Sequence, residues 1–196
     1  MARPAQFSTA AILDAARARV VEDGPGATTI AAIAAEVGAP TGSLYHRFPS
    51  RDVLLATLWL DTVERFQAGY LAAISEPDVR AAVRRARTFF FSWCREHLTE
   101  ARLLLLHRRE DLLRGDWPPE VRDRAAAVTR DFDAGLRAFA RRAFGSTDDV
   151  ALRRARFAVV DLLFAGARGY LAAGTPPPPD VEALVQEAAD AVMKGT

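Results

Sequence analysis

Two helix-stop signals lie about ten residues apart near the N-terminus and leave room for one short helix between them. Gly38 suits the left-handed residue that ends a helix, and Pro40 suits the first position of the next one. The second stop is Phe48-Pro49, because the residue before a proline disfavours helical backbone. A helix of about two turns is seldom stable alone. Neighbouring helices must therefore hold this one in place.

The side chains of this short segment suit display on a surface. Leu44 and Phe48 lie four residues apart and form a single apolar anchor. The other side chains of the segment are mostly polar: Thr41, Ser43, Tyr45, His46 and Arg47. We therefore interpret the segment as a helix that reads DNA.

Two helices are predicted before this segment. Ser8 is placed to cap the first, and Gly24-Pro25-Gly26 ends it. Thr29 is placed to cap the second, which runs from Ile30 to Val37. Two small helices joined by a tight turn match a helix-turn-helix, whose second helix lies in the major groove of DNA.

A family resemblance rests on these residues. Thr28-Thr29-Ile30-Ala31-Ala32-Ile33-Ala34, then Gly38, then Gly42 to Arg51 resemble the N-terminal signature of the tetracycline-repressor (TetR) family of transcriptional regulators. The resemblance covers about the first quarter of the chain. It implies an all-α fold of about nine to ten helices, with a DNA-binding domain of three helices over residues 1–50. Residues 51–196 then form a helical domain that binds an effector and dimerises.

The resemblance also implies which residues contact DNA: Thr28, Thr29, Thr41, Gly42, Ser43, Tyr45, His46 and Arg51. Thr41, Gly42 and Ser43 are expected at base edges or phosphate, and the other five at phosphates. Tyr45 as a packing residue and His46 as a plain surface residue are the ordinary alternatives. Pro40 and Thr41 stand where the family often has Ser and Lys, so one common cationic contact is absent.

Charge and composition limit the other classes of function. The net charge of the whole chain is +1, so a basic surface must be local, and Arg47 and Arg51 supply it beside the short helix. The single cysteine, Cys94, excludes an internal disulfide and fits a reducing compartment. The longest apolar segment contains Asp161 and Arg168, which indicates a buried helix instead of a membrane span. We expect a cytoplasmic protein that does not enter a membrane.

Five further helices are predicted after the DNA-reading segment. Their expected bounds are Arg51 to about Ser75, Val79 to Leu98, Glu120 to Phe144, Val150 to Ala173, and Val181 to Met193. The first of them connects the DNA-binding domain to the rest of the chain. A change in its tilt would change the separation of two reading helices in a dimer, which is a plausible basis for release from DNA.

An effector pocket is expected beside the aromatic cluster Phe89-Phe90-Phe91, because ligand pockets are apolar with few polar groups. The predicted ligand-binding residues are Phe66, Phe89, Phe90, Trp93, His97 and His107. Aromatic residues at this spacing are more often plain core, and a histidine satisfied within the fold is the ordinary alternative for His97 and His107. No cofactor is predicted, and the effector is an unidentified small molecule.

The helix Val150 to Ala173 is apolar most of the way round in its second half and carries several small residues. Such a helix needs neighbours on both sides, and a partner subunit can supply one of them. With the helix before it, as in the resembled family, it gives the predicted homodimer interface: Phe132, Leu136, Phe157, Val160, Phe164 and Gly166. A central helix in a monomer is the alternative.

A ligand-responsive repressor that binds a pseudo-palindromic site on double-stranded DNA is therefore the leading hypothesis. An enzyme is a weaker one, because the sequence has no phosphate-binding Gly-rich loop, no His-Glu-x-x-His zinc helix and no second cysteine. A helical dimeric protein that binds partners or small molecules without DNA is the third. It leaves the compact N-terminal domain and the uncharged remainder of the chain without a purpose, although it accommodates the predicted dimer interface equally well.

Overall fold

The computed structural model describes residues 7–107 and 117–194, and every regular element in these two ranges is helical. The elements are α1 (Thr9–Asp23), α2 (Ile30–Val37), α3 (Thr41–Tyr45), α4 (Arg51–Ile74), α5 (Val79–Glu96), α6 (Leu98–Leu106), α8 (Pro119–Phe144), α9 (Asp149–Arg156), the π-helical turn η1 (Phe157–Asp161), α10 (Leu162–Ala172) and α11 (Pro179–Lys194). The predicted all-α fold is confirmed.

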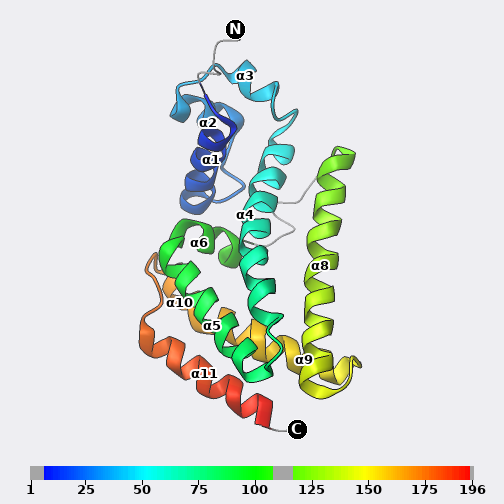
Figure 1. The fold of residues 1–196 in the computed structure, drawn as a ribbon. Coiled ribbons are helices and arrows are strands. Elements are labelled where there is room, and N and C mark those ends of the chain that lie inside the picture. Colours follow the sequence, from blue (N-terminus) through cyan, green and yellow to red (C-terminus); the bar gives the residue numbers. More distant parts are fainter. Residues whose placement is uncertain (1–6, 108–116, 195–196) are drawn as a thin grey trace.

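The first three helices form one end of the molecule, which we call the head (Figure 1). Helix α4 runs from the head along the length of the body and packs against α5 and α8. Helix α9 packs against the C-terminal part of α8, and α11 lies at the end opposite to the head, near the C-terminus. The head is therefore joined to the body through the continuous helix α4.

Side-chain caps explain where the head's helices begin. Ser8 Oγ accepts a hydrogen bond from the Ala11 amide at 3.1 Å, and Thr29 Oγ1 accepts one from Ala32 at 3.1 Å. Both predicted caps are confirmed. Gly38 ends α2 in the left-handed conformation, with φ of 67°, as its position predicts.

The structure corrects two helix boundaries. The helix predicted over Val150 to Ala173 is interrupted by η1, where one extra residue enters the helical turn and the Leu162 amide bonds to the Phe157 carbonyl. The helix predicted to reach Leu98 ends at Glu96, because His97 leaves helical geometry with φ of −128° and ψ of 52°. Helix α6 starts immediately after that break.

Two apolar clusters form the interior. The first holds the head together and extends along the first half of α4 to Leu103, Val121, Ala125 and Val128 in the body. The second surrounds the fully buried rings of Phe90, Phe91 and Phe139. Burying one such side chain stabilises a fold by roughly 1.5–3 kcal/mol. The division of the chain into two domains at residue 50 stays a prediction, because α4 contributes to both clusters.

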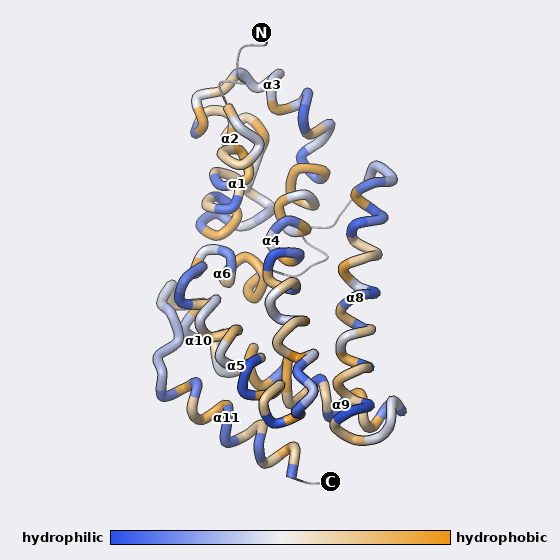
Figure 2. Tube along the Cα trace, viewed as in Figure 1, coloured by the Kyte–Doolittle hydropathy of each residue, from blue (hydrophilic) through white to orange (hydrophobic). Residues whose placement is uncertain are grey.

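Helices α8 and α11 alternate apolar and hydrophilic segments along their length, as expected for helices with one buried side (Figure 2). Among the described residues, no helix is both long enough and apolar enough to cross a membrane.

Candidate nucleic-acid interface and effector chamber

Helix α3 is anchored by its apolar pair. Leu44 is fully buried and Phe48 is 4% exposed, and the Phe48 amide bonds to the Leu44 carbonyl at 2.8 Å. The helix begins after Pro40, which occupies the cap position instead of the predicted first helical position. A helix of five residues is not stable alone, so packing on the core of the head stabilises α3.

The outer side of α3 is accessible. Thr41, Gly42, Tyr45 and His46 are exposed, and the Tyr45 side chain is 52% exposed. A Cβ atom at Gly42 would meet nothing within 4 Å, so a DNA backbone can approach closely there. Ser43 is half-buried and its hydroxyl donates to the Pro40 carbonyl at 2.7 Å, which leaves the oxygen only as an acceptor. The structure brings these five predicted residues together on one short segment.

The two threonines before α2 differ in position. Thr29 is exposed beside the helix start. Thr28 is 1% exposed, and its hydroxyl donates to the Gly24 carbonyl at 3.0 Å. The Thr28 side chain thus faces the head's interior and not the surface that a phosphate would approach.

Arg51 also points inward, although the family resemblance implies a phosphate contact. Its Nε donates to the Thr28 carbonyl at 2.5 Å, a terminal nitrogen donates to the Pro25 carbonyl, and Nη1 lies 3.2 Å from Asp52. These bonds fasten the loop between α1 and α2 to the start of α4. Sequence reasoning missed this structural role, because the carbonyls come from residues more than twenty positions away.

The remaining head arginine has a different environment. In the described part of the head, Arg17, Arg19 and Arg51 each have a carboxylate within 4.0 Å, whereas Arg47 has none. Arg47 is half-buried just after α3, and its Nη1 lacks a hydrogen-bond partner. A guanidinium with a buried, unpaired nitrogen is costly, so a nearby anion would stabilise it.

Comparison with known proteins agrees with this geometry. Residues 12–58 match the family model described as "Bacterial regulatory proteins, tetR family". This segment contains α2, α3 and the start of α4. Over these residues the chain is similar to the TetR family. The predicted resemblance to this family is thereby confirmed over the head and the start of α4.

Solved TetR-family structures share the whole fold. A TetR-like transcriptional regulator from Rhodococcus sp. RHA1 is 21% identical with a TM-score of 0.72, and the match covers 100% of both chains. PfmR from Thermus thermophilus is 24% identical with a TM-score of 0.68 over 97% of both chains. FadR from Bacillus subtilis, solved with stearoyl-CoA, is 16% identical with a TM-score of 0.71 over 96% of this chain and 100% of that one. No curated protein matches this sequence.

The body of the chain contains a cavity of about 530 Å³, which we call the chamber. It lies between α4, α6, α8 and the segment from η1 to α10. Its lining residues are Trp59, Val63, Phe66, Gln67, Tyr70, Leu104, Leu105, Val128, Thr129, Phe132, Asp133, Arg156, Val160, Asp161 and Phe164. The size and the apolar lining are those of a small-molecule site.

Only Phe66 of the predicted ligand-binding residues lines the chamber. Trp93 and Phe90 pack behind Phe66, with ring centroids 4.8 Å and 6.2 Å from it. Phe89 lines a separate groove, where its ring lies against Gly69. The predicted aromatic residues of α5 are therefore core or groove residues. Little in the sequence indicated that the side of α4 that carries Trp59, Val63 and Tyr70 would line a cavity.

The two histidines lie outside the chamber lining. His97 is exposed at the end of α5, with its ring 6.0 Å from that of Trp93. His107 is half-buried and directly follows α6. Neither is placed to contact a ligand inside the chamber in this structure.

The π-helical turn η1 shapes one wall of the chamber. The Tyr70 hydroxyl donates a hydrogen bond to the Val159 carbonyl within this turn. Burial, with a contribution from Asp161, raises the pKa of Tyr70 far above its ordinary value. Tyr70 therefore keeps its proton and holds Val160 and Asp161 at the chamber wall.

The predicted dimer-interface residues differ in their surroundings. Phe132, Val160 and Phe164 line the chamber, and Leu136 is buried at 7% exposure. Gly166 packs within the chain, because a Cβ there would lie 2.7 Å from Val185 of α11. Phe157 is 47% exposed and stays available to a partner.

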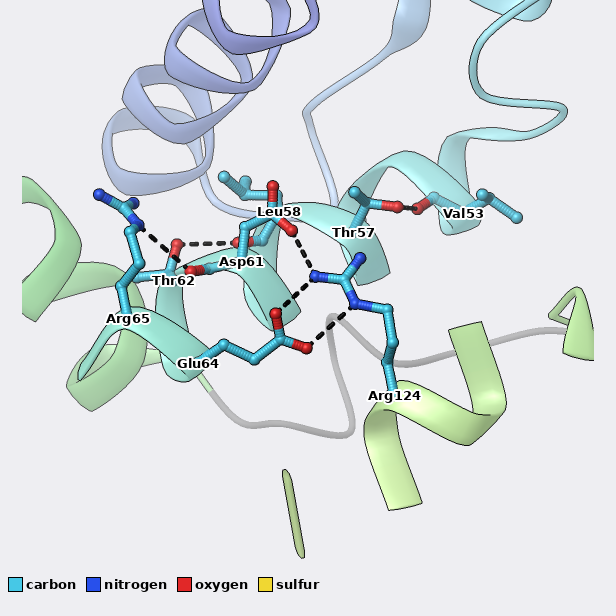
Figure 3. Close-up of polar contacts among 8 residues, drawn as sticks. All are labelled: Val53, Thr57, Leu58, Asp61, Thr62, Glu64, Arg65 and Arg124. Atoms are coloured by element: carbon cyan, nitrogen blue, oxygen red, sulfur yellow. Dashed lines mark hydrogen bonds and ion pairs between the residues drawn. The ribbon is translucent and has the colours of Figure 1, made fainter. Parts of the chain in front are cut away.

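An ionic clasp joins α4 to α8 beside the chamber (Figure 3). The guanidinium of Arg124 on α8 donates to Glu64 at 2.8 and 3.0 Å and to Asp61 at 2.5 Å. The hydrogen bonds to Glu64, then those to Asp61, raise the pKa of Arg124. The clasp fixes the N-terminal part of α8 against the helix that carries the head.

A second ionic contact joins the body to the head. Glu100 in the first turn of α6 is 7% exposed and lies 2.9 Å from Arg65 of α4 and 3.7 Å from Arg17 of α1. The other end of α6 carries Leu104 and Leu105, which line the chamber. One helix therefore touches both the chamber and the head.

Proposed function

We propose that this TetR-family regulator is a ligand-responsive repressor, which binds a pseudo-palindromic operator as a homodimer and is released by a small apolar effector. The observation that carries the proposal is the exposure of α3 at the tip of the head, with Leu44 and Phe48 buried beneath it. A short, polar, exposed helix held by a core suits insertion into a major groove.

The proposed DNA contacts divide by role. Thr41, Gly42 and Ser43 approach base edges, whereas Tyr45, His46 and Thr29 bind phosphates. Arg47 joins the phosphate set, because it is the described head arginine without a carboxylate partner. Thr28 and Arg51 serve mainly by holding the start of α2 and the preceding loop in place.

The homodimer is proposed to form on the outer side of η1 and α10. Phe157, Asp161, Ala165 and Gly169 recur every four residues, and all are exposed. A Cβ at Gly169 would meet nothing within 4 Å, so a partner helix can approach closely there. Gly169 thus takes the role that sequence reasoning gave to Gly166.

The chamber is proposed to hold the effector. It is aromatic, adjoins both α4 and α6, and has a volume that accommodates a small molecule. The neighbour FadR was solved with stearoyl-CoA, so the same fold can hold a ligand with a long acyl chain.

Release is proposed to follow two connections from the chamber to the head. An occupant that displaces Leu104 and Leu105 moves α6, and Glu100 of α6 forms an ion pair with Arg17 of α1. An occupant that separates α4 from α8 strains the Arg124 clasp and tilts α4. Either change alters the separation of the two α3 helices in a dimer.

Selection of genomic DNA fragments on the purified protein at low salt tests this function. The expected result is enrichment of fragments that share an inverted repeat, with retention that falls steeply as salt rises. A helical interaction protein without DNA binding would retain no fragment above background at any salt concentration. That result would refute the proposal.

A further inference from the structure

The chamber's buried wall carries no charged side chain among its described lining residues. Trp59, Val63, Phe66, Tyr70, Leu105, Val128 and Val160 are each at most 9% exposed. The charged lining residues are Asp133, Arg156 and Asp161, and all three are exposed. The chamber therefore has an uncharged interior and a charged rim.

The charges on this rim do not cancel. Arg156 Nε lies 3.5 Å from Asp161 Oδ1, so the one cation of the described lining is already paired. Asp133 has no ion pair with any described residue. Arg137 and Arg153 flank an adjoining groove that shares Asp133 and Arg156, but they do not line the chamber. The lining itself is left with one uncompensated carboxylate.

Aromatic rings dominate the wall next to this carboxylate. Trp59, Phe66, Tyr70, Phe132 and Phe164 all line the chamber, and Phe66 stacks on Tyr70 with ring centroids 5.2 Å apart. The face of an aromatic ring attracts a cation, and the attraction grows when water is excluded. The ring faces and the Asp133 carboxylate both attract positive charge, so both favour a cationic ligand.

We propose that the effector of this chamber is a cationic amphiphile, with its apolar body among the rings and its ammonium group at the rim beside Asp133 and Phe132. The inference rests on the proposed function of the chamber as the effector site. An anionic headgroup would meet Asp133 and the paired Asp161 at the same rim and would be repelled.

Three matched probes test the sign of the charge: octyltrimethylammonium, octanol and octanoate. Each is titrated calorimetrically into the full-length protein at low salt and below its micelle-forming concentration. The expected order of affinity is the cation first, roughly 3–10-fold tighter than the alcohol, and the carboxylate last. Raising the salt concentration should shrink the advantage of the cation over the alcohol.

Two substitutions on α8 test whether the cationic group binds beside Asp133. Asp133→Asn should remove roughly threefold or more of the cation's affinity and leave that of octanol unchanged. Asp131→Asn is the matched control, because Asp131 lies on the same helix but lines the neighbouring groove against α4. The control should keep the wild-type order of the three probes.

Octanoate binding more tightly than octyltrimethylammonium, with an affinity lost in Arg153→Ala, would overturn the proposed ligand class. If octanol and octanoate release the operator in that case, the regulatory function of the chamber still stands. If none of the probes binds while genomic fragments are retained, both the ligand class and the chamber's effector role are wrong. If Asp133→Asn and Asp131→Asn changed the affinity for octyltrimethylammonium equally, that result would also contradict the proposed placement of the ammonium group.

Discussion

Glu100 of α6 lies 3.7 Å from Arg17 of α1, so a buried carboxylate of the body pairs with a guanidinium of the head, which also lies 2.7 Å from Asp14. Arg65 of α4 reaches the same oxygen at 2.9 Å, and the second Glu100 oxygen is buried without a hydrogen-bond partner. Glu100 of α6 therefore contacts both α4, through Arg65, and the head, through Arg17. This contact links α1 to α6, the helix whose Leu104 and Leu105 line the chamber.

Replacing Glu100 by Gln should weaken the attachment of the head. The change keeps the shape of the side chain but removes the charge that Arg17 and Arg65 share, which should lower the free energy of unfolding by about 1–3 kcal/mol. Urea unfolding measures the loss. Glu96→Gln is the control, because Glu96 is exposed at the end of α5. Equal stability of the two variants would contradict the coupling.

Neighbouring residues of α3 should behave differently when substituted. Tyr45→Phe removes an exposed hydroxyl and should weaken DNA binding on every sequence alike, with unfolding unchanged. Leu44→Ala removes a fully buried side chain and should destabilise the protein by roughly 2–5 kcal/mol. Binding titrations and urea unfolding on both variants provide the comparison. A loss of stability in Tyr45→Phe would mean that Tyr45 packs instead of contacting phosphate.

Two glycines of α10 provide a matched test of the dimer surface. Gly166→Ala forces a Cβ to within 2.7 Å of Val185 and should cost roughly 1–3 kcal/mol of stability. Gly169→Ala meets open space within the chain and should raise helix stability slightly, yet weaken dimerisation. Analytical ultracentrifugation and thermal unfolding distinguish the two effects. If Gly169→Ala dimerised as tightly as the wild type, the dimer interface would not include Gly169.

Cys94 should be unreactive in the folded protein. Burial raises the pKa of its thiol from 9.0 to about 12, so the reactive thiolate is scarce near neutral pH. Because the folded pKa lies above the unfolded one, this thiol's contribution to stability is complete below about pH 9 and is lost as the pH rises toward 12. A thiol reagent at about pH 8 should modify Cys94 only at the rate of unfolding. Rapid modification of the native protein would contradict this burial.

Local sequence signals predicted the head well. The caps Ser8 and Thr29, the left-handed Gly38 and the anchor of Leu44 on Phe48 are short-range features, and the structure confirms each of them. The inward orientation of Arg51 could not be predicted in this way. Its carbonyl partners lie on the loop before α2, so the orientation depends on how α4 packs against that loop.

The lining of the chamber was harder to predict from the sequence. The prediction placed its wall on α5, where aromatic residues are densest, but Phe90 is fully buried and Phe89 faces another groove. Phe132 and Phe164 were assigned to the dimer, because periodicity marks a buried side without telling a cavity from an interface. The π-helical turn that presents Val160 to the chamber leaves no recognisable signal in a single sequence.

Footprinting of the wild-type protein on an enriched fragment, compared with Tyr45→Phe at several salt concentrations, tests dimeric DNA binding through α3 most directly. The expected result is protection of two inverted half-sites whose centres lie about one helical turn, or a multiple of it, apart, and weaker protection by the variant. A single unpaired footprint, or protection that is independent of both Tyr45 and salt, would contradict binding as a dimer through α3.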